Sequence, residues 1–189
     1  MDTNKEQYEY ASQEMKRHIE DATTSKIAHF IICDKYGKQE NTMKWINAFS
    51  FSGIVVSWFI STQVFTLLEN GGFNISVVWS TVTQSVIPIL FVIASIISTT
   101  VLFLNRYGEK SRSHREAAQR YQRLWRKALN NKTEYPTIIH AKELAKRAVI
   151  YRDELNEINN SSPDIEEWAW VKVSLERKKG GTEYDVDNS

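Results

Sequence analysis

Residues 45–105 read WINAFSFSGIVVSWFISTQVFTLLENGGFNISVVWSTVTQSVIPILFVIASIISTTVLFLN. Glu69 is the only Asp, Glu, Lys or Arg residue in this stretch, and Asn70, Gly71 and Gly72 follow it with turn-forming chemistry. The turn separates two apolar arms, about 45–68 and 76–104, and each arm exceeds the ~20 residues that a helix needs to cross the hydrocarbon. The stretch therefore predicts a transmembrane helical hairpin.

A buried helical hairpin in a soluble bundle is the alternative, because both arms contain many Ser and Thr residues. A soluble domain of 189 residues has little room to bury two such helices on every side. Helices on the surface of a soluble protein normally carry a charged face, and neither arm has one. The pattern favours the membrane.

Basic residues flank the hairpin on both sides, whereas the connecting loop contains no Lys or Arg. Lys35, Lys38 and Lys44 precede the first arm, and Arg106 and Lys110 follow the second. Positively charged flanks are retained on the cytoplasmic side, so the sequence predicts a two-pass protein with both termini in the cytoplasm.

The predicted fold class is all-α: a transmembrane hairpin with a cytoplasmic bundle of N- and C-terminal helices. Residues 1–44 are expected to form cytoplasmic helices at 4–18 and 23–34, with a break at 37–41 before the hairpin at 45–105. Residues 106–179 form the second cytoplasmic region, and the acidic residues 180–189 are expected to be a disordered tail.

Three helices are predicted in the region 106–179. The first continues from Arg106, carries an apolar stripe that includes Tyr121 and Leu124, and ends before Pro136. The second spans 138–158, with Leu144, Tyr151 and similar residues along one side. The third is expected to begin at Ser162 as the N-cap, with Pro163 in the first helical position.

Catalytic signatures are missing from the sequence. It has no phosphate-binding glycine loop, no zinc-ligand spacing and no nucleophile motif. His18, His29, His114 and His140 are scattered, and Cys33 is expected to be a small buried residue in a reduced cytoplasm. We therefore expect a protein that is not an enzyme and that needs no cofactor or metal.

Polar and small residues recur along one face of each arm, at the spacing that places them side by side on a helix. One interpretation is that they line a water-filled pore in an oligomer, and the other is that they form hydrogen bonds between helices. Both interpretations stay open. The residues are Ser50, Gly53, Ser57, Ser61 and Gln63 in the first arm and Thr81, Gln84, Ser85, Pro88, Ser95 and Thr99 in the second.

The segment after the second arm is strongly basic. It could contact an anionic ligand such as a nucleotide, or it could signal topology and attract anionic lipid head groups. No nucleic-acid partner is expected. The residues that carry this charge are Arg106, Lys110, Arg112, Arg115, Arg120, Arg123 and Arg126.

Two runs and the order of the parts carry a family resemblance that covers about 19–178. The runs are RYGEK at 106–110, continuing through AAQRYQRLW at 117–125, and SPDIEEW at 162–168. With the two apolar arms between cytoplasmic helices, the chain resembles the SLATT family, two-transmembrane domains associated with bacterial nucleotide-signalling and nucleotide-sensing systems.

The resemblance implies an effector of bacterial antiviral or abortive-infection defence in the inner membrane. Such an effector forms a homo-oligomeric pore, or otherwise breaches the bilayer, after a partner nucleotidyltransferase or nucleotide sensor is activated. The alternative is a non-conducting membrane-anchored adaptor, or a ligand-binding receptor, that recruits a cytoplasmic partner.

Overall fold

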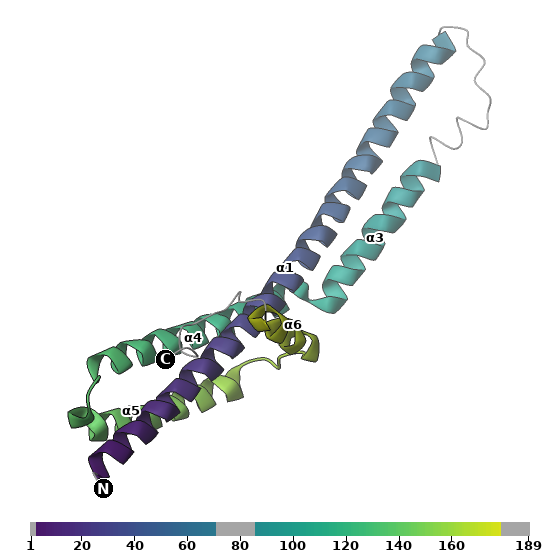
Figure 1. Cartoon of the computed structure of the whole chain (residues 1–189). Coiled ribbons are helices and arrows are strands. Elements are labelled where there is room, and N and C mark those ends of the chain that lie inside the picture. The colour runs from purple at the N-terminus through teal and green to yellow at the C-terminus, as the bar shows by residue number, and fades with distance from the viewer. Residues whose placement is uncertain (1–2, 71–85, 179–189) are drawn as a thin grey trace. The chain divides into compact units, whose positions relative to one another are not determined.

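The computed structural model describes residues 3–70 and 86–178 (Figure 1). Every regular element in these two ranges is a helix, and neither range contains a strand, which confirms the all-α prediction. The predicted turn after Glu69 and the predicted disordered tail at 180–189 lie outside the described residues.

The chain divides into two compact units, which are described separately. We call Met1–Lys35 with Glu109–Ser189 the bundle unit, and Tyr36–Gly108 the arm unit. The boundaries fall close to the ends of the apolar stretch seen in the sequence.

Helix α1 runs without interruption over Thr3–Asn70, a length of 68 residues, so the predicted break at 37–41 is wrong. Gly37 costs a helix only about 1 kcal/mol relative to Ala, and no proline accompanies it. The following turns are well supported. Lys44 forms an ion pair with Glu40 at 2.5 Å, and the Thr42 hydroxyl donates to the Lys38 carbonyl at 2.9 Å.

The bundle unit combines the first half of α1 with α4 (Tyr107–Glu134), the short 3₁₀ helix η2 (Ile138–His140), α5 (Ala141–Ser161) and α6 (Glu167–Lys178) (Figure 1). Its core brings the predicted apolar stripes of α4 and α5 against α1, which confirms both stripes. The buried residues are Ala11, Met15, Ile19, Ala22, Ala117, Tyr121, Leu124, Ala128, Leu144, Ala148, Tyr151 and Leu155.

Two predicted helix starts are wrong. Arg106 does not continue a helix: it adopts a left-handed conformation with φ 48°, and its N–H caps α3 by donating to the Leu102 carbonyl at 3.2 Å. Such a conformation costs roughly 1–3 kcal/mol outside glycine, so the surrounding structure must hold it. Ser162 is the C-cap of α5 and not the N-cap of the next helix, because residues 163–166 are not helical and α6 begins at Glu167.

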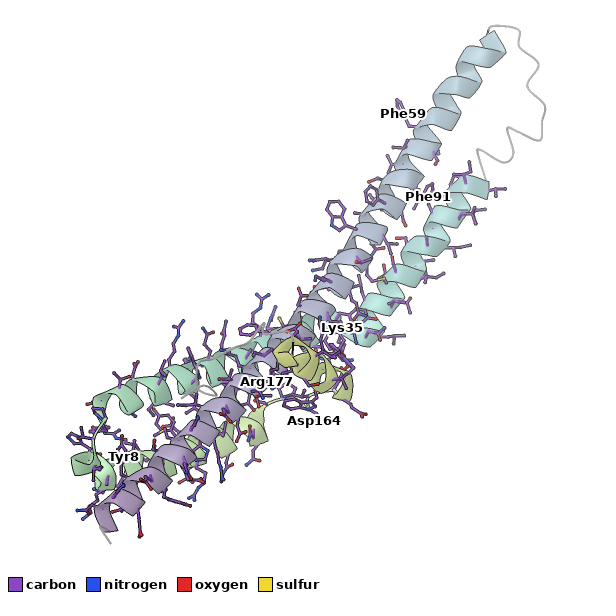
Figure 2. The ribbon with its side chains drawn as sticks, in the orientation of Figure 1. Tyr8, Lys35, Phe59, Phe91, Asp164 and Arg177 are labelled. Atoms are coloured by element: carbon purple, nitrogen blue, oxygen red, sulfur yellow. The ribbon has the colours of Figure 1, made fainter. Side chains whose placement is uncertain are left out.

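The later start of α6 has a tertiary cause. The ammonium of Lys35 lies 3.9 Å from the centroid of the Trp168 ring and 3.9 Å from a Glu166 carboxylate oxygen. At the other end of α6, Arg177 donates a hydrogen bond to Thr24. These contacts place α6 along α1 and leave 163–166 as the connection that reaches it (Figure 2).

The arm unit pairs the second half of α1 with α3 (Ile87–Asn105) (Figure 1). The helices approach closely at Gly53, where a Cβ atom would meet the ring of Phe91 at 2.6 Å. Any larger residue at position 53 would force that ring to move. The small residue that the sequence pattern picked out therefore lies at a close helix–helix contact.

Candidate functional site

Helix α3 presents apolar side chains to its surroundings. Its 19 residues span roughly 28 Å at 1.5 Å per residue, close to the thickness of the hydrocarbon core. Among the described residues, one stretch, Ile87–Asn131, is long and apolar enough to cross a membrane, and α3 is its apolar part. Only 6% of that apolar part is buried, which argues against a core helix of a soluble bundle.

The facing half of α1 is also exposed on its apolar side. Phe49, Phe51 and Trp58 each expose 68% of their surface. Figure 2 shows Phe59 projecting from α1 away from α3, whereas Phe91 lies between the two helices. Large exposed apolar patches of this kind mark contact with a membrane or with another protein.

An amide on α1 gathers hydroxyl groups from α3. The Asn47 side-chain nitrogen donates to the Thr99 hydroxyl at 2.8 Å, and its oxygen accepts from Ser95 at 3.0 Å and Ser98 at 2.8 Å. The Thr99 hydroxyl also lies 3.2 Å from this oxygen, so three hydroxyls share the two lone pairs of one acceptor. We call Asn47, Ser95, Ser98 and Thr99 the Asn47 cluster.

The sequence pattern found Ser95 and Thr99 but missed Asn47 and Ser98. Asn47 is two residues from the start of the predicted arm, where polar residues are common, so nothing marked it as a partner for the second arm. An amide side chain within an otherwise apolar segment indicates a polar partner, and this feature of Asn47 could have identified it. Ser98 lies three residues after Ser95, a helical neighbour that the chosen stripe passed over.

The structure describes only some of the other polar and small residues predicted in the two arms. Ser50 is buried, Ser57 is half-buried, and Pro88 stands in the first turn of α3. The side chains of Ser61 and Gln63 lie outside the described part of the chain. So do residues Thr81, Gln84 and Ser85, and with them the predicted free carbonyl beside Pro88.

The predicted basic residues do not form one site. Arg112, Arg115, Arg123 and Arg126 are exposed along α4, and Arg120 donates to the Ser161 hydroxyl at 3.1 Å. A groove of about 460 Å³ runs between α4 and α5, lined by both basic and acidic residues, and a smaller one of about 240 Å³ lies on α4 itself. Arg106 and Lys110 belong to different units.

A buried histidine pair joins α1 to α4 in the bundle unit. His29 and His114 approach Nδ1 to Nδ1 at 2.8 Å, and their side chains are 0% and 5% exposed. One ring must donate and the other accept, so the contact fits two neutral imidazoles. The Tyr121 ring stacks on His29 with centroids 5.4 Å apart. Sequence reasoning missed the pair because its members are 85 residues apart.

Burial controls the charge of this pair. It lowers the pKa of His29 to about 4, with a further contribution from His114. Burial also lowers the pKa of His114. The Glu166 carboxylate acts in the opposite direction and raises this pKa, whereas the Lys110 ammonium lowers it further. Both rings are therefore neutral near pH 7.

The titratable residues suggest no metal centre within the described ranges, where no group of three or more His, Cys, Asp or Glu side chains is arranged to hold an ion. Cys33 is buried and lies 3.5 Å from the Ser111 hydroxyl.

No protein-family model, curated protein or solved structure matches the chain.

Proposed function

We propose that this chain is a two-pass protein of the bacterial inner membrane, with α3 and the second half of α1 in the bilayer and both termini in the cytoplasm. One observation carries the proposal: α3 contains no Asp, Glu, Lys or Arg and leaves its large apolar side chains uncovered. Exposing such a helix to water is unfavourable by roughly 25 cal/mol for each Å² of apolar surface.

In this proposal the protein is a homo-oligomeric effector of antiviral or abortive-infection defence. The support for this part is the sequence resemblance to the SLATT family together with the absence of recognised catalytic motifs. The bundle unit receives a signal linked to a nucleotidyltransferase or nucleotide sensor, and the arm units then assemble. The polar face that includes Ser95 and Thr99 opens a hydrated path, and the membrane depolarises.

A topology experiment tests the membrane part. Reporters that are active only in the cytoplasm, fused separately to the two ends, should both be active, and the protein should resist carbonate extraction. Reporters on opposite sides, or protein that remains in the aqueous fraction without detergent, would reject the two-pass arrangement.

Inducible expression with a voltage-sensitive dye tests the effector part. Expression under activating conditions should depolarise the cells, and Thr99→Leu or Gln84→Leu should change the extent of depolarisation. The matched control is Thr100→Leu, because the Thr100 hydroxyl bonds only to the Ile96 carbonyl of its own helix. A normal membrane potential in activated cells would reject the pore.

A non-conducting adaptor is the second candidate, and the Asn47 cluster favours it. The hydroxyls of Ser95 and Thr99 already have partners within one chain, so they need no water-filled lumen to satisfy them. An adaptor would leak no dye from liposomes yet retain a cytoplasmic partner. A pore would require the Asn47 cluster to open when chains assemble.

A further inference from the structure

Two grooves meet at Arg123 of α4, and their linings differ in charge. The larger one, between α4 and α5, contains Glu154 and Glu157 opposite Arg120 and Lys127. Lys127 forms an ion pair with Glu154 in this groove. Its basic side chains are therefore largely compensated by acids of the same groove, and an added anion would meet both signs of charge.

The smaller groove, of about 240 Å³, is lined by Gln119, Gln122, Arg123 and Arg126, with no carboxylate among them. We call this the α4 arginine groove. Arg123 and Arg126 are both exposed, and neither forms an ion pair with a described residue. Arg123 also lines the larger groove with Glu154 and Glu157, whereas Arg126 lines only the α4 arginine groove. Among the described residues, the lining of the α4 arginine groove therefore has a net positive charge.

A neighbouring cation shows how this charge acts on its surroundings. Lys26 of α1 lies over the Trp125 ring, 4.6 Å from its centroid. Burial lowers the pKa of Lys26, and repulsion from Arg126 lowers it further. An anion in the α4 arginine groove would relieve that repulsion.

The residue types that line the groove suit an anion better than an apolar protein surface. Each planar guanidinium offers parallel N–H donors that match two phosphate oxygens, and the two glutamine amides add neutral donors. None of the four lining residues is apolar, so burying this surface would gain little hydrophobic free energy. Its volume of about 240 Å³ leaves room for a small polyanion.

We propose that the α4 arginine groove binds a soluble phosphate-bearing anion with at least two negative charges, held by the guanidinium groups of Arg123 and Arg126. Gln119 and Gln122 donate hydrogen bonds to the remaining oxygens. The inference does not depend on whether the arm unit conducts ions, since all four residues belong to the bundle unit.

Titration calorimetry on the full chain in a neutral detergent tests the proposal, with inorganic pyrophosphate as the probe at low ionic strength. Saturable binding of one pyrophosphate per chain is expected. The double variant R123Q/R126Q should weaken binding at least tenfold. Both arginines are exposed, so the variant should keep the circular-dichroism spectrum of the parent.

The matched control is R112Q/R115Q, which removes the same charge from exposed positions of the same helix outside the groove. It should change the affinity by less than twofold. A second control, R120Q/K127Q, alters the larger groove and leaves Arg126 intact. Equal losses in all three double variants would overturn the proposal, because diffuse charge rather than the groove would then bind.

Lipid nanodiscs distinguish a free phosphate from a lipid head group. The parent chain should bind pyrophosphate with the same affinity in nanodiscs of neutral and of anionic phospholipid, compared at one ionic strength. No saturable pyrophosphate binding in detergent would overturn the proposal, and binding that is lost only in anionic nanodiscs would assign the groove to a lipid head group and also overturn it.

Discussion

The bundle unit and the arm unit are both helical, yet the bundle unit buries its large apolar side chains and the arm unit exposes them. In the bundle unit, Met15, Leu144 and Tyr151 are at most 1% exposed and form a core among charged surfaces. In the arm unit, Phe103 and Leu104 are 80% and 71% exposed, whereas serines such as Ser50 and Ser98 are buried. The same helix, α1, contributes to both units. The two units therefore bury different kinds of side chain: mainly apolar ones in the bundle unit, and hydroxyl-bearing ones between the helices of the arm unit.

The largest expected effect comes from placing charge on the exposed face of α3. Ile93→Arg with Ile96→Arg should abolish stable membrane integration, because each arginine near the centre of a span costs roughly 2.5–3.5 kcal/mol. Carbonate extraction of cell membranes measures the loss. Val149→Arg with Ile150→Arg, at exposed positions of α5, should leave integration unchanged. Similar extraction of both variants would show that the two units face the same solvent.

A core truncation sharpens the comparison from the other side. Leu144→Ala in α5 should destabilise the bundle unit by about 2–5 kcal/mol, because a fully buried leucine leaves a cavity. Hydrogen exchange measured peptide by peptide should show faster exchange in α4 and α5. The counterpart Ile96→Ala, at a position 61% exposed, should leave exchange in the bundle unit as it was.

The sequence was sufficient for the all-α class and for the buried faces of α4 and α5, because helical periodicity is a local property of the chain. It also located the small residue at Gly53. It was wrong where tertiary contacts decide the outcome. Cation–π and ionic contacts of Lys35 with the chain near Trp168 start α6 later than Ser162, and Arg106 ends a helix without glycine. Neither the Lys35 contacts nor the left-handed conformation of Arg106 leaves a local pattern in the sequence.

The candidate sites divide in the same way. Periodicity placed Ser95 and Thr99 on one face of α3, but their partner Asn47 is about fifty positions away, and no single-sequence signal joins them. The contact between His29 and His114 could not be predicted for the same reason, because the two residues are 85 positions apart. The arginines of α4 were all recognised, but only the three-dimensional arrangement separates Arg120, which faces acidic neighbours, from Arg126, which does not.

The histidine pair predicts a pH dependence that belongs to the bundle unit alone. The pKa of His29 is about 4 when folded and near 6.5 when unfolded, so the unfolded chain binds more protons below pH 6.5. The free energy of unfolding should therefore be constant above pH 6.5 and fall as the pH drops towards 4, by up to about 3 kcal/mol.

Thermal unfolding followed by circular dichroism between pH 7.5 and 4 measures this loss. His29→Leu combined with His114→Leu should flatten the profile in that interval, since neither residue can then take up a proton. A control at an exposed histidine contact, His140→Leu, should keep the slope. An unchanged slope in the double variant would assign the acid sensitivity to other groups.

The smallest expected effect concerns the polar contacts inside the arm unit. Asn47→Leu removes the shared amide, but the freed hydroxyls can bond to carbonyls of their own helix, as Thr100 does with Ile96 at 2.8 Å. A double-mutant cycle of Asn47→Leu with Thr99→Val should give a coupling energy of about 0.6 kcal/mol, measured by steric trapping in lipid nanodiscs. The cycle of Asn47→Leu with Thr100→Val should give none. Coupling in both cycles would mean that Asn47 acts through the backbone of α3 rather than through the Thr99 hydroxyl, and the arm unit would then be held by helix packing, as the bundle unit is.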